Sequence, residues 1–288
     1  MLQEINIDEF EDFMADLLGI CESFEEMVYE FEGNINLNPE YLERVYPEEK
    51  ESLKKLRKQI KDHKEWKEKH GLNHELYKND SDEHPILPQA AVQHIYQESE
   101  GKAFVTSDVG QHQMVACRYD KFNRSQSNLT SVGLGTMGFG LPSAMGVKLA
   151  YPEEEVICIT GEGSIQMCIQ ELSTCSQYKL PIKIFNINNL SLGIVKQWQD
   201  MNYEGRHSSI SYEDSLPDFV ALAESYGHVG IKITKNSELK EEIAKALSIK
   251  DKLVFVDIYV DPNEHVYPML VAPNGSLKDM WLGKGKKT

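Results

Sequence analysis

Two short apolar runs, Val156–Ile159 and Ile182–Phe185, constrain the fold of this chain more than any other feature. A helix-length segment separates them, and this pattern predicts a β-α-β unit. Because the two strands of such a unit end at the same edge of a parallel sheet, the turns that follow them are expected to lie side by side. The first run is followed by Gly161–Ser164 and the second by Asn188–Asn189.

These two turns carry groups that suit a metal ion and a diphosphate. Glu162 supplies a carboxylate, and Asn189 supplies an amide oxygen 27 positions later. Mg²⁺ binds oxygen ligands and usually keeps phosphate oxygens in its shell. Glycine N–H groups beside them would approach a phosphate closely. The sequence therefore predicts a site for a cofactor with a metal-bound diphosphate.

From Pro85 onward, strand and helix patterns alternate along the chain. The expected strands are 103–108, 129–132, 156–160, 182–186, 229–231 and 253–260, and the expected helices are 89–100, 111–119, 140–150, 165–178, 190–201, 216–226 and 237–248. Such alternation predicts an α/β fold, a doubly wound, mostly parallel sheet flanked by helices with right-handed crossovers. We assign residues 85–288 to this domain and its C-terminal tail.

Residues 1–84 are interpreted as an acidic, helical extension that ends in a linker. Apolar side chains at helical spacing predict an amphipathic helix over 8–32, and a charged helix is expected over 48–70. Residues 1–50 hold 15 Asp or Glu against Arg44 and Lys50. The helix over 8–32 is expected to cover a core or a partner, because its acidic polar face disfavours a membrane surface.

Charge, hydropathy and cysteines exclude several classes of function. The net charge of −16 opposes binding to nucleic acid. No run of about 18 apolar residues is present, and the start is acidic, unlike a secretory signal. The five cysteines, at 21, 117, 158, 168 and 175, form no CxxC pair. We therefore expect reduced thiols, no zinc site and a cytoplasmic protein.

Four loops, each after a strand and before a helix, are expected at the carboxyl edge of the sheet. They are 108–113, 133–140, 161–164 and 188–193, and all are rich in glycine or amide groups. Gln111 and His112 add donors for phosphate oxygens. One such loop alone would be an ordinary tight turn, but four at one edge favour a ligand site. Gly133–Gly138 fits GxGxxG, yet the acidic residue of a nicotinamide site is missing about 20 positions later.

Four longer stretches carry a family resemblance. They are Ser107–Met114, Gly133–Pro142, Val195–Gln199 and Glu264–Met269. With them, the chain from about Pro85 to Leu282 resembles the C-terminal, thiamine-diphosphate-binding domain of the acetolactate synthase (acetohydroxyacid synthase) large catalytic subunit. The glycine and asparagine turns are shared by many thiamine-diphosphate enzymes, whereas the tryptophan segment and the His-Val-Tyr-Pro ending are typical of acetolactate synthases.

The resemblance implies roles for residues at the matching positions. Mg²⁺ would be held by Glu162, Asn189 and the backbone oxygen of Ser191, and Trp198 would line the substrate channel. The diphosphate and the rest of the cofactor would contact Gly110, Gln111, His112, Gly163, Ser164, the carbonyls near Gly135 and Met137, and the side chains of Met167 and Ile194. Taken from the residues alone, Met137 and Ile194 are equally compatible with plain core packing, and Trp198 with a helix-face anchor. His207, Tyr212 and His265 are expected to be polar groups of the surface or core rather than catalysts.

The resemblance also implies a reaction and its partners. Acetolactate synthases decarboxylate pyruvate and transfer the hydroxyethyl group to a second 2-oxo acid, pyruvate or 2-oxobutyrate, in branched-chain amino-acid biosynthesis. In that family a glutamate of a pyrimidine-binding domain activates the cofactor, and a third domain binds flavin. We therefore expect a second polypeptide to bring the pyrimidine- and flavin-binding domains, with FAD entering only through it. A regulatory subunit and a homo- or hetero-oligomer are further expectations.

Two departures from the family keep alternatives open. Glu162 stands where the family has aspartate, and the extra methylene predicts weaker Mg²⁺ binding, because Mg²⁺ tolerates little distortion. The pyrimidine- and flavin-binding domains have no counterpart in the 288 residues. The chain is then half of a split enzyme, with 8–32 as a docking face, or an inactive homologue that modulates an intact subunit. Another thiamine-diphosphate carboligase or decarboxylase is the remaining alternative.

Overall fold

The computed structural model describes residues 58, 61, 62, 65, 81–120, 122, 126–212, 214–270, 280–283 and 286–287. The chain divides into two compact units, Met1–Asn73 and His74–Thr288. The helix predicted over 8–32 lies outside the described residues, as does most of the one predicted over 48–70. The boundary predicted after residue 84 stays a prediction.

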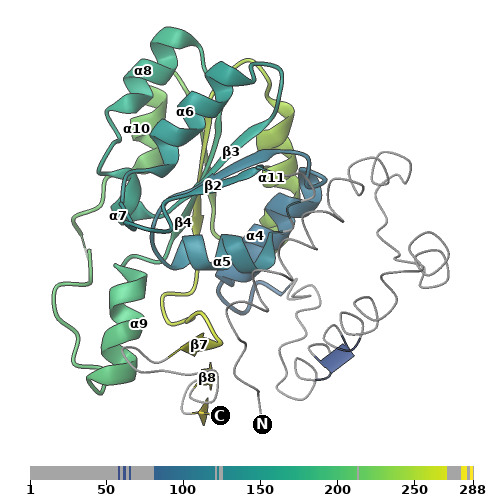
Figure 1. The fold of residues 1–288 in the computed structure, drawn as a ribbon. Coiled ribbons are helices and arrows are strands. Elements are labelled where there is room, and N and C mark those ends of the chain that lie inside the picture. The colour runs from purple at the N-terminus through teal and green to yellow at the C-terminus, as the bar shows by residue number, and fades with distance from the viewer. Residues whose placement is uncertain are drawn as a thin grey trace, which may run out of the picture. The chain divides into compact units, whose positions relative to one another are not determined.

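A six-stranded parallel sheet forms the centre of the second unit (Figure 1). Its strands are β1 (Phe104–Ser107), β2 (Asn128–Thr130), β3 (Val156–Thr160), β4 (Lys183–Asn188), β5 (Val229–Ile233) and β6 (Val254–Tyr259), in the order β2-β1-β3-β4-β6-β5. All neighbouring pairs in this sheet are parallel. The predicted α/β fold is confirmed.

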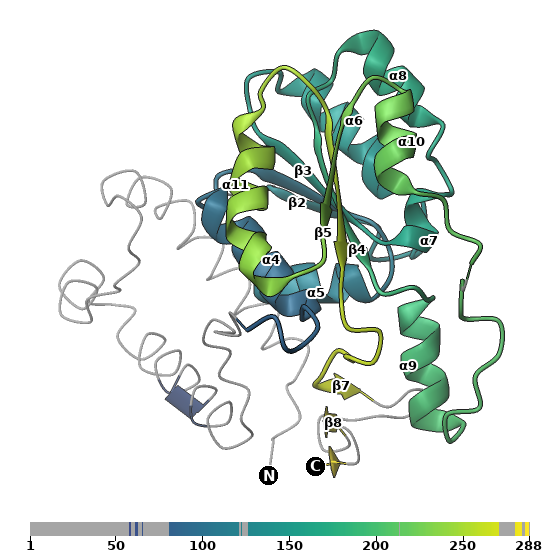
Figure 2. The same cartoon turned by 180° about the vertical axis from the view of Figure 1, so that it is seen from behind.

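Helices cover both faces of the sheet, as Figures 1 and 2 show. One face carries α4 (Pro88–Glu98), α5 (Gln111–Tyr119) and α11 (Leu239–Ser248), and the other carries α6 (Gly140–Ala150), α8 (Glu171–Tyr178) and α10 (Phe219–Ser225). Successive strand residues point to opposite faces. Ile157 and Ile159 thus enter the first core cluster, whereas Val156 and Cys158 enter the second.

Two predicted helices have different bounds in the structure. The single helix expected over 165–178 is wrong: α7 (Glu162–Ile165) and α8 are separate, because Met167 N and Cys168 N bond carbonyls three residues back and tighten the chain. α9 (Gly193–Asn202) begins three residues later than expected. Leu190 has a positive φ of 58°, and Leu192 N donates to Ile210 O at 2.8 Å, so the chain enters this helix only after a turn.

The strand order brings particular loops together. β1 lies between β2 and β3, so the connections that leave β1 and β3 run to opposite faces and leave a crevice at their carboxyl ends, the usual ligand position in such sheets. β6 is inserted between β4 and β5, which places the segment after β6 beside the turn after β4.

The C-terminal part and the remaining short elements complete the described chain. An antiparallel sheet that the sequence did not predict contains β7 (Met269–Leu270), β8 (Met280–Gly283) and β9 (Lys286–Lys287), and a 3₁₀ helix, η2 (Asn236–Glu238), precedes α11. Cys117, Cys158, Cys168 and Cys175 are free thiols, as expected. Within the described residues, no helix has the length and apolar character needed to cross a membrane.

Candidate functional site

A buried carboxylate, Asp108, holds the loops of three strands together at the carboxyl edge. Its Oδ1 accepts hydrogen bonds from Val109 N at 3.0 Å and Gly138 N at 2.8 Å, and its Oδ2 accepts one from Thr160 Oγ1 at 3.3 Å. Burial raises the pKa of Asp108, although the hydrogen bonds oppose that change. Asp108 was not among the site residues predicted from the sequence. Its position directly after β1 was the available signal.

The imidazole of His112 is wedged between two glycines. A Cβ at Gly110 would lie 2.6 Å from His112 Cε1, and a Cβ at Gly161 would lie 2.6 Å from His112 Nδ1, so neither position has room for a side chain. Burial lowers the pKa of His112 to about 3, which makes the ring neutral. Its buried Nε2 has no hydrogen-bond partner. The ring therefore offers an unused polar atom at the N-terminus of α5.

Two predicted metal ligands converge on one backbone N–H. Ser191 N donates to Glu162 Oε1 at 2.6 Å and to Asn189 Oδ1 at 3.2 Å, and Ser191 Oγ donates to the same amide oxygen at 3.3 Å. Glu162 is only 2% exposed. Burial raises its pKa to about 7; backbone N–H groups lower the pKa, and the negative charge of Asp257 raises it further.

Gly163 and Ser164, the predicted partners of the diphosphate, lie directly beside this carboxylate. Ser164 Oγ donates to Val109 O at 2.7 Å, which joins α7 to the loop after β1. A Cβ at Gly163 would collide with the hydroxyl oxygen of Tyr212. Tyr212 reaches this place because residues 190–192 pair with 210–212. Burial and the charge of Glu162 raise the pKa of its phenol. The sequence had suggested a surface or core position for Tyr212, whereas the structure places it against the site.

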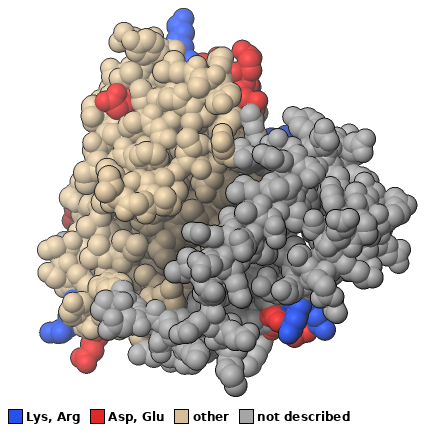
Figure 3. Space-filling model, viewed as in Figure 1, with Lys and Arg blue, Asp and Glu red and all other residues tan. Residues whose placement is uncertain are grey.

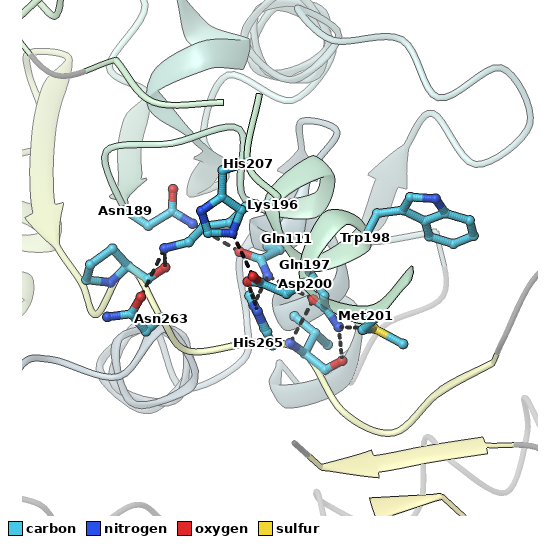
Figure 4. Close-up of polar contacts among 12 residues, drawn as sticks. Gln111, Asn189, Lys196, Gln197, Trp198, Asp200, Met201, His207, Asn263 and His265 are labelled. Carbon is cyan, nitrogen blue, oxygen red and sulfur yellow. Dashed lines mark hydrogen bonds and ion pairs between the residues drawn. The ribbon is translucent and has the colours of Figure 1, made fainter. Parts of the chain in front are cut away.

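The other predicted site residues lie around this centre. Gly135, with a φ of +62°, is exposed in the loop after β2, and Met137 is half-buried there. Met167 is 59% exposed and approaches Gly138, where a Cβ would lie 2.8 Å from Met167 Cβ. Ile194 and Trp198 are half-buried on α9. The indole of Trp198 points away from Gln111 and His265 in Figure 4.

Gln111 is brought to Asn189, but its side chain is engaged with protein groups. Gln111 Oε1 accepts from Asn189 Nδ2 at 3.0 Å, and Gln111 Nε2 donates to Gln197 Oε1 at 2.8 Å (Figure 4). Gln197 is fully buried. Gln197 was predicted only as part of the motif Val195–Gln199. Its polar side chain within that helix was the signal that could have identified it.

Comparison with known proteins identifies the family of the domain that carries this site. Residues 108–258 match the family described as "Thiamine pyrophosphate enzyme, C-terminal TPP binding domain". This chain belongs to that family. The match begins directly after β1 and runs into β6, so it contains all the connecting loops described above, and it confirms the fold and family that the sequence predicted.

Relatives within this family are named acetolactate synthases. The chain is 55% identical over 213 residues to the acetolactate synthase isozyme 3 large subunit of Escherichia coli strain K12, covering 73% of this chain and 37% of the relative. It is 56% identical over 199 residues to an acetolactate synthase large subunit of Haemophilus influenzae (69% and 34%), and 43% identical over 203 residues to one of Cyanidium caldarium (70% and 34%). The chain thus spans about a third of the length of these curated relatives.

Proposed function

We propose that this chain binds thiamine diphosphate with Mg²⁺ at the carboxyl edge of its sheet and forms the diphosphate-binding part of an acetolactate synthase-type transferase. The observation that carries the proposal is the convergence of Glu162 Oε1 and Asn189 Oδ1 on Ser191 N, at the carboxyl edge of the sheet of a thiamine-diphosphate-binding domain. The reaction class is supported by the 55% identity to an acetolactate synthase large subunit.

The residues present fit a metal-bound diphosphate. The oxygens that meet at Ser191 are of the kind that Mg²⁺ prefers. The raised pKa of Glu162 shows that its negative charge is costly where it is buried, and a cation would relieve that cost. At the N-terminus of α5, the unpartnered Nε2 of His112 suits a hydrogen bond to a phosphate oxygen.

The roles that the family resemblance implies are proposed for the residues of this chain. Glu162, Asn189 and the carbonyl of Ser191 hold the metal. Gly110, Gly163 and Ser164 line the diphosphate with the backbone N–H of Gln111 and the ring of His112, while Gly135, Met137, Met167 and Ile194 meet the rest of the cofactor. Trp198 shapes the space for the second 2-oxo acid. Gln111 contributes its backbone, since its side chain is bonded to Asn189 and Gln197.

The proposed substrates are pyruvate and a second 2-oxo acid, either pyruvate or 2-oxobutyrate. Thiamine diphosphate, when bound, supplies the carbon nucleophile and accepts the electron pair released with CO₂. The protein positions it: the ring of His112, neutral because it is buried, would donate its Nε2–H to a phosphate oxygen and hold that oxygen in place. The products would be 2-acetolactate or 2-aceto-2-hydroxybutyrate, which lead to branched-chain amino acids.

A second polypeptide completes the site in this proposal. Val132, Leu134 and Met167 are 84%, 93% and 59% exposed beside the cofactor edge. Figure 3 shows few charged side chains on the face of the second unit seen there, and these lie near its margins. Interface cores are depleted in charge. Such a surface suits a partner with the pyrimidine- and flavin-binding domains, through which FAD would enter. A regulatory subunit, an oligomer of these chains and a cytoplasmic location remain parts of the proposal.

The test is acetolactate formation from pyruvate with Mg²⁺ and thiamine diphosphate, with and without the candidate partner. Activity that requires both chains supports the proposal. An isolated chain that is stable and active contradicts the need for a partner. A chain that binds Mg²⁺ and thiamine diphosphate but forms a different product from pyruvate points to another carboligase or decarboxylase. The chain is a modulating homologue if two results are found together. The partnered chains do not turn over pyruvate, and adding this chain changes the activity of an intact acetolactate synthase subunit.

A further inference from the structure

The side-chain amides of Asn189, Gln111 and Gln197 lie in a row (Figure 4). Through a hydrogen bond from Gln197, this row connects the metal end of the site to the backbone of Val266. We propose that Gln197 is a positioning residue: it sets the orientation of the Gln111 and Asn189 amides, and so keeps Asn189 Oδ1 directed at the metal position. The role toward Mg²⁺ rests on the proposed function. The orientation of the amides does not, and it is open to a separate measurement.

The backbone of Val266 determines which way the Gln197 amide points. A backbone N–H only donates and a backbone carbonyl only accepts. Val266 N donates to Gln197 Oε1 at 3.0 Å, and Gln197 Nε2 donates to Val266 O at 2.8 Å. Turning this amide over would place its NH₂ against Val266 N–H and its oxygen against Val266 O. The side chain is 0% exposed, so water could not compensate for the lost hydrogen bonds. Its orientation is therefore fixed from outside the metal site.

This orientation passes to the next two amides. Because Gln197 Oε1 is an acceptor, Gln111 must present Nε2 to it, at 2.8 Å. Gln111 Oε1 then faces Asn189, which must present Nδ2, at 3.0 Å. Asn189 Oδ1 is left on the side of Ser191 N, where Glu162 Oε1 also lies. Ser191 N is a donor, so it requires the oxygen of the Asn189 amide to face it. The contacts at Val266 and at Ser191 therefore select the same orientation of the three amides.

A histidine supports the same orientation of Gln111. His265 Nε2 lies 2.7 Å from Asp200 Oδ2, and a carboxylate accepts, so Nε2 carries the proton. When Nε2 alone is protonated, Nδ1 is an acceptor, 3.4 Å from Gln111 Nε2. This contact again selects the NH₂ end of the Gln111 amide.

The helix α9 thereby joins the segment after β6 to the metal end of the site. Besides Gln197 and Asp200, Lys196 contacts this segment, donating to Pro262 O at 2.6 Å and to Asn263 Oδ1 at 3.1 Å. Outer partners of metal ligands typically change metal affinity about 10- to 100-fold when they are removed. Packing of residues 262–266 on α9 and the affinity for Mg²⁺ are therefore coupled through Gln197.

The experiment compares Gln197→Met with Gln199→Met. Methionine keeps the volume of glutamine but makes no amide hydrogen bonds. Gln199 is a matched control on the same helix, because it also bonds both backbone groups of one residue: Ser208 N donates to Gln199 Oε1 at 2.9 Å, and Gln199 Nε2 donates to Ser208 O at 3.1 Å. Those bonds do not lead to Asn189.

The first readout is the exchange with water of the Asn189 side-chain NH₂ in cofactor-free protein, followed by NMR after selective ¹⁵N-asparagine labelling. We expect exchange about fivefold faster in Gln197→Met, from the typical net worth of one hydrogen bond, and unchanged in Gln199→Met. Equal exchange in wild type and Gln197→Met overturns the proposal. Where Gln197→Met does not fold, Gln111→Met is measured instead. It should speed exchange at Asn189 and leave the Val266 N–H protected, and an unchanged Asn189 again overturns the proposal.

The second readout is the dissociation constant for Mg²⁺ in the presence of thiamine diphosphate, measured by calorimetry. Gln197→Met should weaken Mg²⁺ binding about 10-fold or more, with Gln199→Met equal to wild type. A lower melting temperature with an unchanged Mg²⁺ constant means a structural role only and overturns the proposal. If wild type itself binds no Mg²⁺, the proposed function fails, and the exchange of the Asn189 amide alone decides whether Gln197 orients it.

Discussion

The two ends of the site differ in how far this chain itself supports them. At the proposed metal and diphosphate end, Glu162, His112 and Asn189 are each less than a tenth exposed, and they come from α7, α5 and the turn after β4. In the loop after β2, by contrast, Val132 and Leu134 are 84% and 93% exposed. One end is organised by buried polar contacts, whereas the other presents apolar side chains to whatever binds there. This difference is tested by substitutions that change one of three properties and not the others: the stability of the fold, the affinity for Mg²⁺ and the association with a partner chain.

The largest effect is expected at Glu162. Because its folded pKa is raised from 4.5 to about 7, the contribution of this group to stability is full below pH 4.5 and is lost as pH rises through 7. Glu162→Gln removes the buried charge, and it should stabilise the cofactor-free protein at pH 8 by about 2 to 3 kcal/mol. The same change should abolish Mg²⁺ binding.

Denaturant unfolding at pH 8 and at pH 4, together with Mg²⁺ titration, checks this prediction. The gain in stability should vanish at pH 4, where the wild-type carboxyl is protonated. A variant that gains nothing at pH 8, or that still binds Mg²⁺ as wild type does, contradicts the assignment of Glu162.

His112 should make the stability depend on pH in the opposite sense. Its folded pKa of about 3 lies below the ordinary 6.5, so the unfolded chain takes up a proton first and stability is lost as pH falls below 6.5. At pH 5 this amounts to about 2 kcal/mol relative to pH 8. Unfolding free energies of wild type and His112→Gln, measured from pH 8 to pH 5, should converge by that amount. Parallel curves would show that the ring is not held neutral.

Gly161→Ala should destabilise the metal and diphosphate end by crowding that ring. The new Cβ would meet His112 Nδ1 at 2.6 Å, and overpacking of a buried group costs about 1 to 3 kcal/mol. Gly133→Ala is the matched control in the loop after β2, since a Cβ there meets nothing within 4 Å. Thermal unfolding should separate the two variants. Equal melting temperatures would mean that His112 moves aside without cost.

A smaller effect is expected from shortening the side chain of Glu162, the carboxylate proposed to bind the metal. Glu162→Asp restores the residue of the resembled family, and we expect Mg²⁺ to bind about tenfold more tightly, or about 1.4 kcal/mol, because Mg²⁺ requires near-ideal geometry. Calorimetric titration with thiamine diphosphate present measures this. An unchanged dissociation constant would remove the claim that glutamate weakens the site.

Much of this arrangement was accessible from the sequence, and the exceptions have physical causes. Continuous apolar runs identified the parallel strands, and the residues after them identified the edge at which Glu162 and Asn189 meet. Long-range polar contacts were missed, because nothing local in the sequence pairs Gln197 with Val266 or Asp108 with Gly138. The break between α7 and α8 was also missed, since helical patterning continues across a turn that differs from a helix only in its hydrogen bonds.

The smallest effect on the fold is expected at the exposed end of the site, where Leu134→Ser should change the free energy of unfolding by less than about 0.5 kcal/mol. The side chain is 93% exposed, so little contact is lost on truncation. If this loop meets a partner chain, however, the same substitution should weaken association with the pyrimidine-binding polypeptide while leaving Mg²⁺ affinity unchanged. Sedimentation or calorimetry with the two chains measures the first, and metal titration the second. A loss of stability comparable to that of Gly161→Ala would mean that the loop after β2 is supported from within, and the contrast between the two ends would disappear.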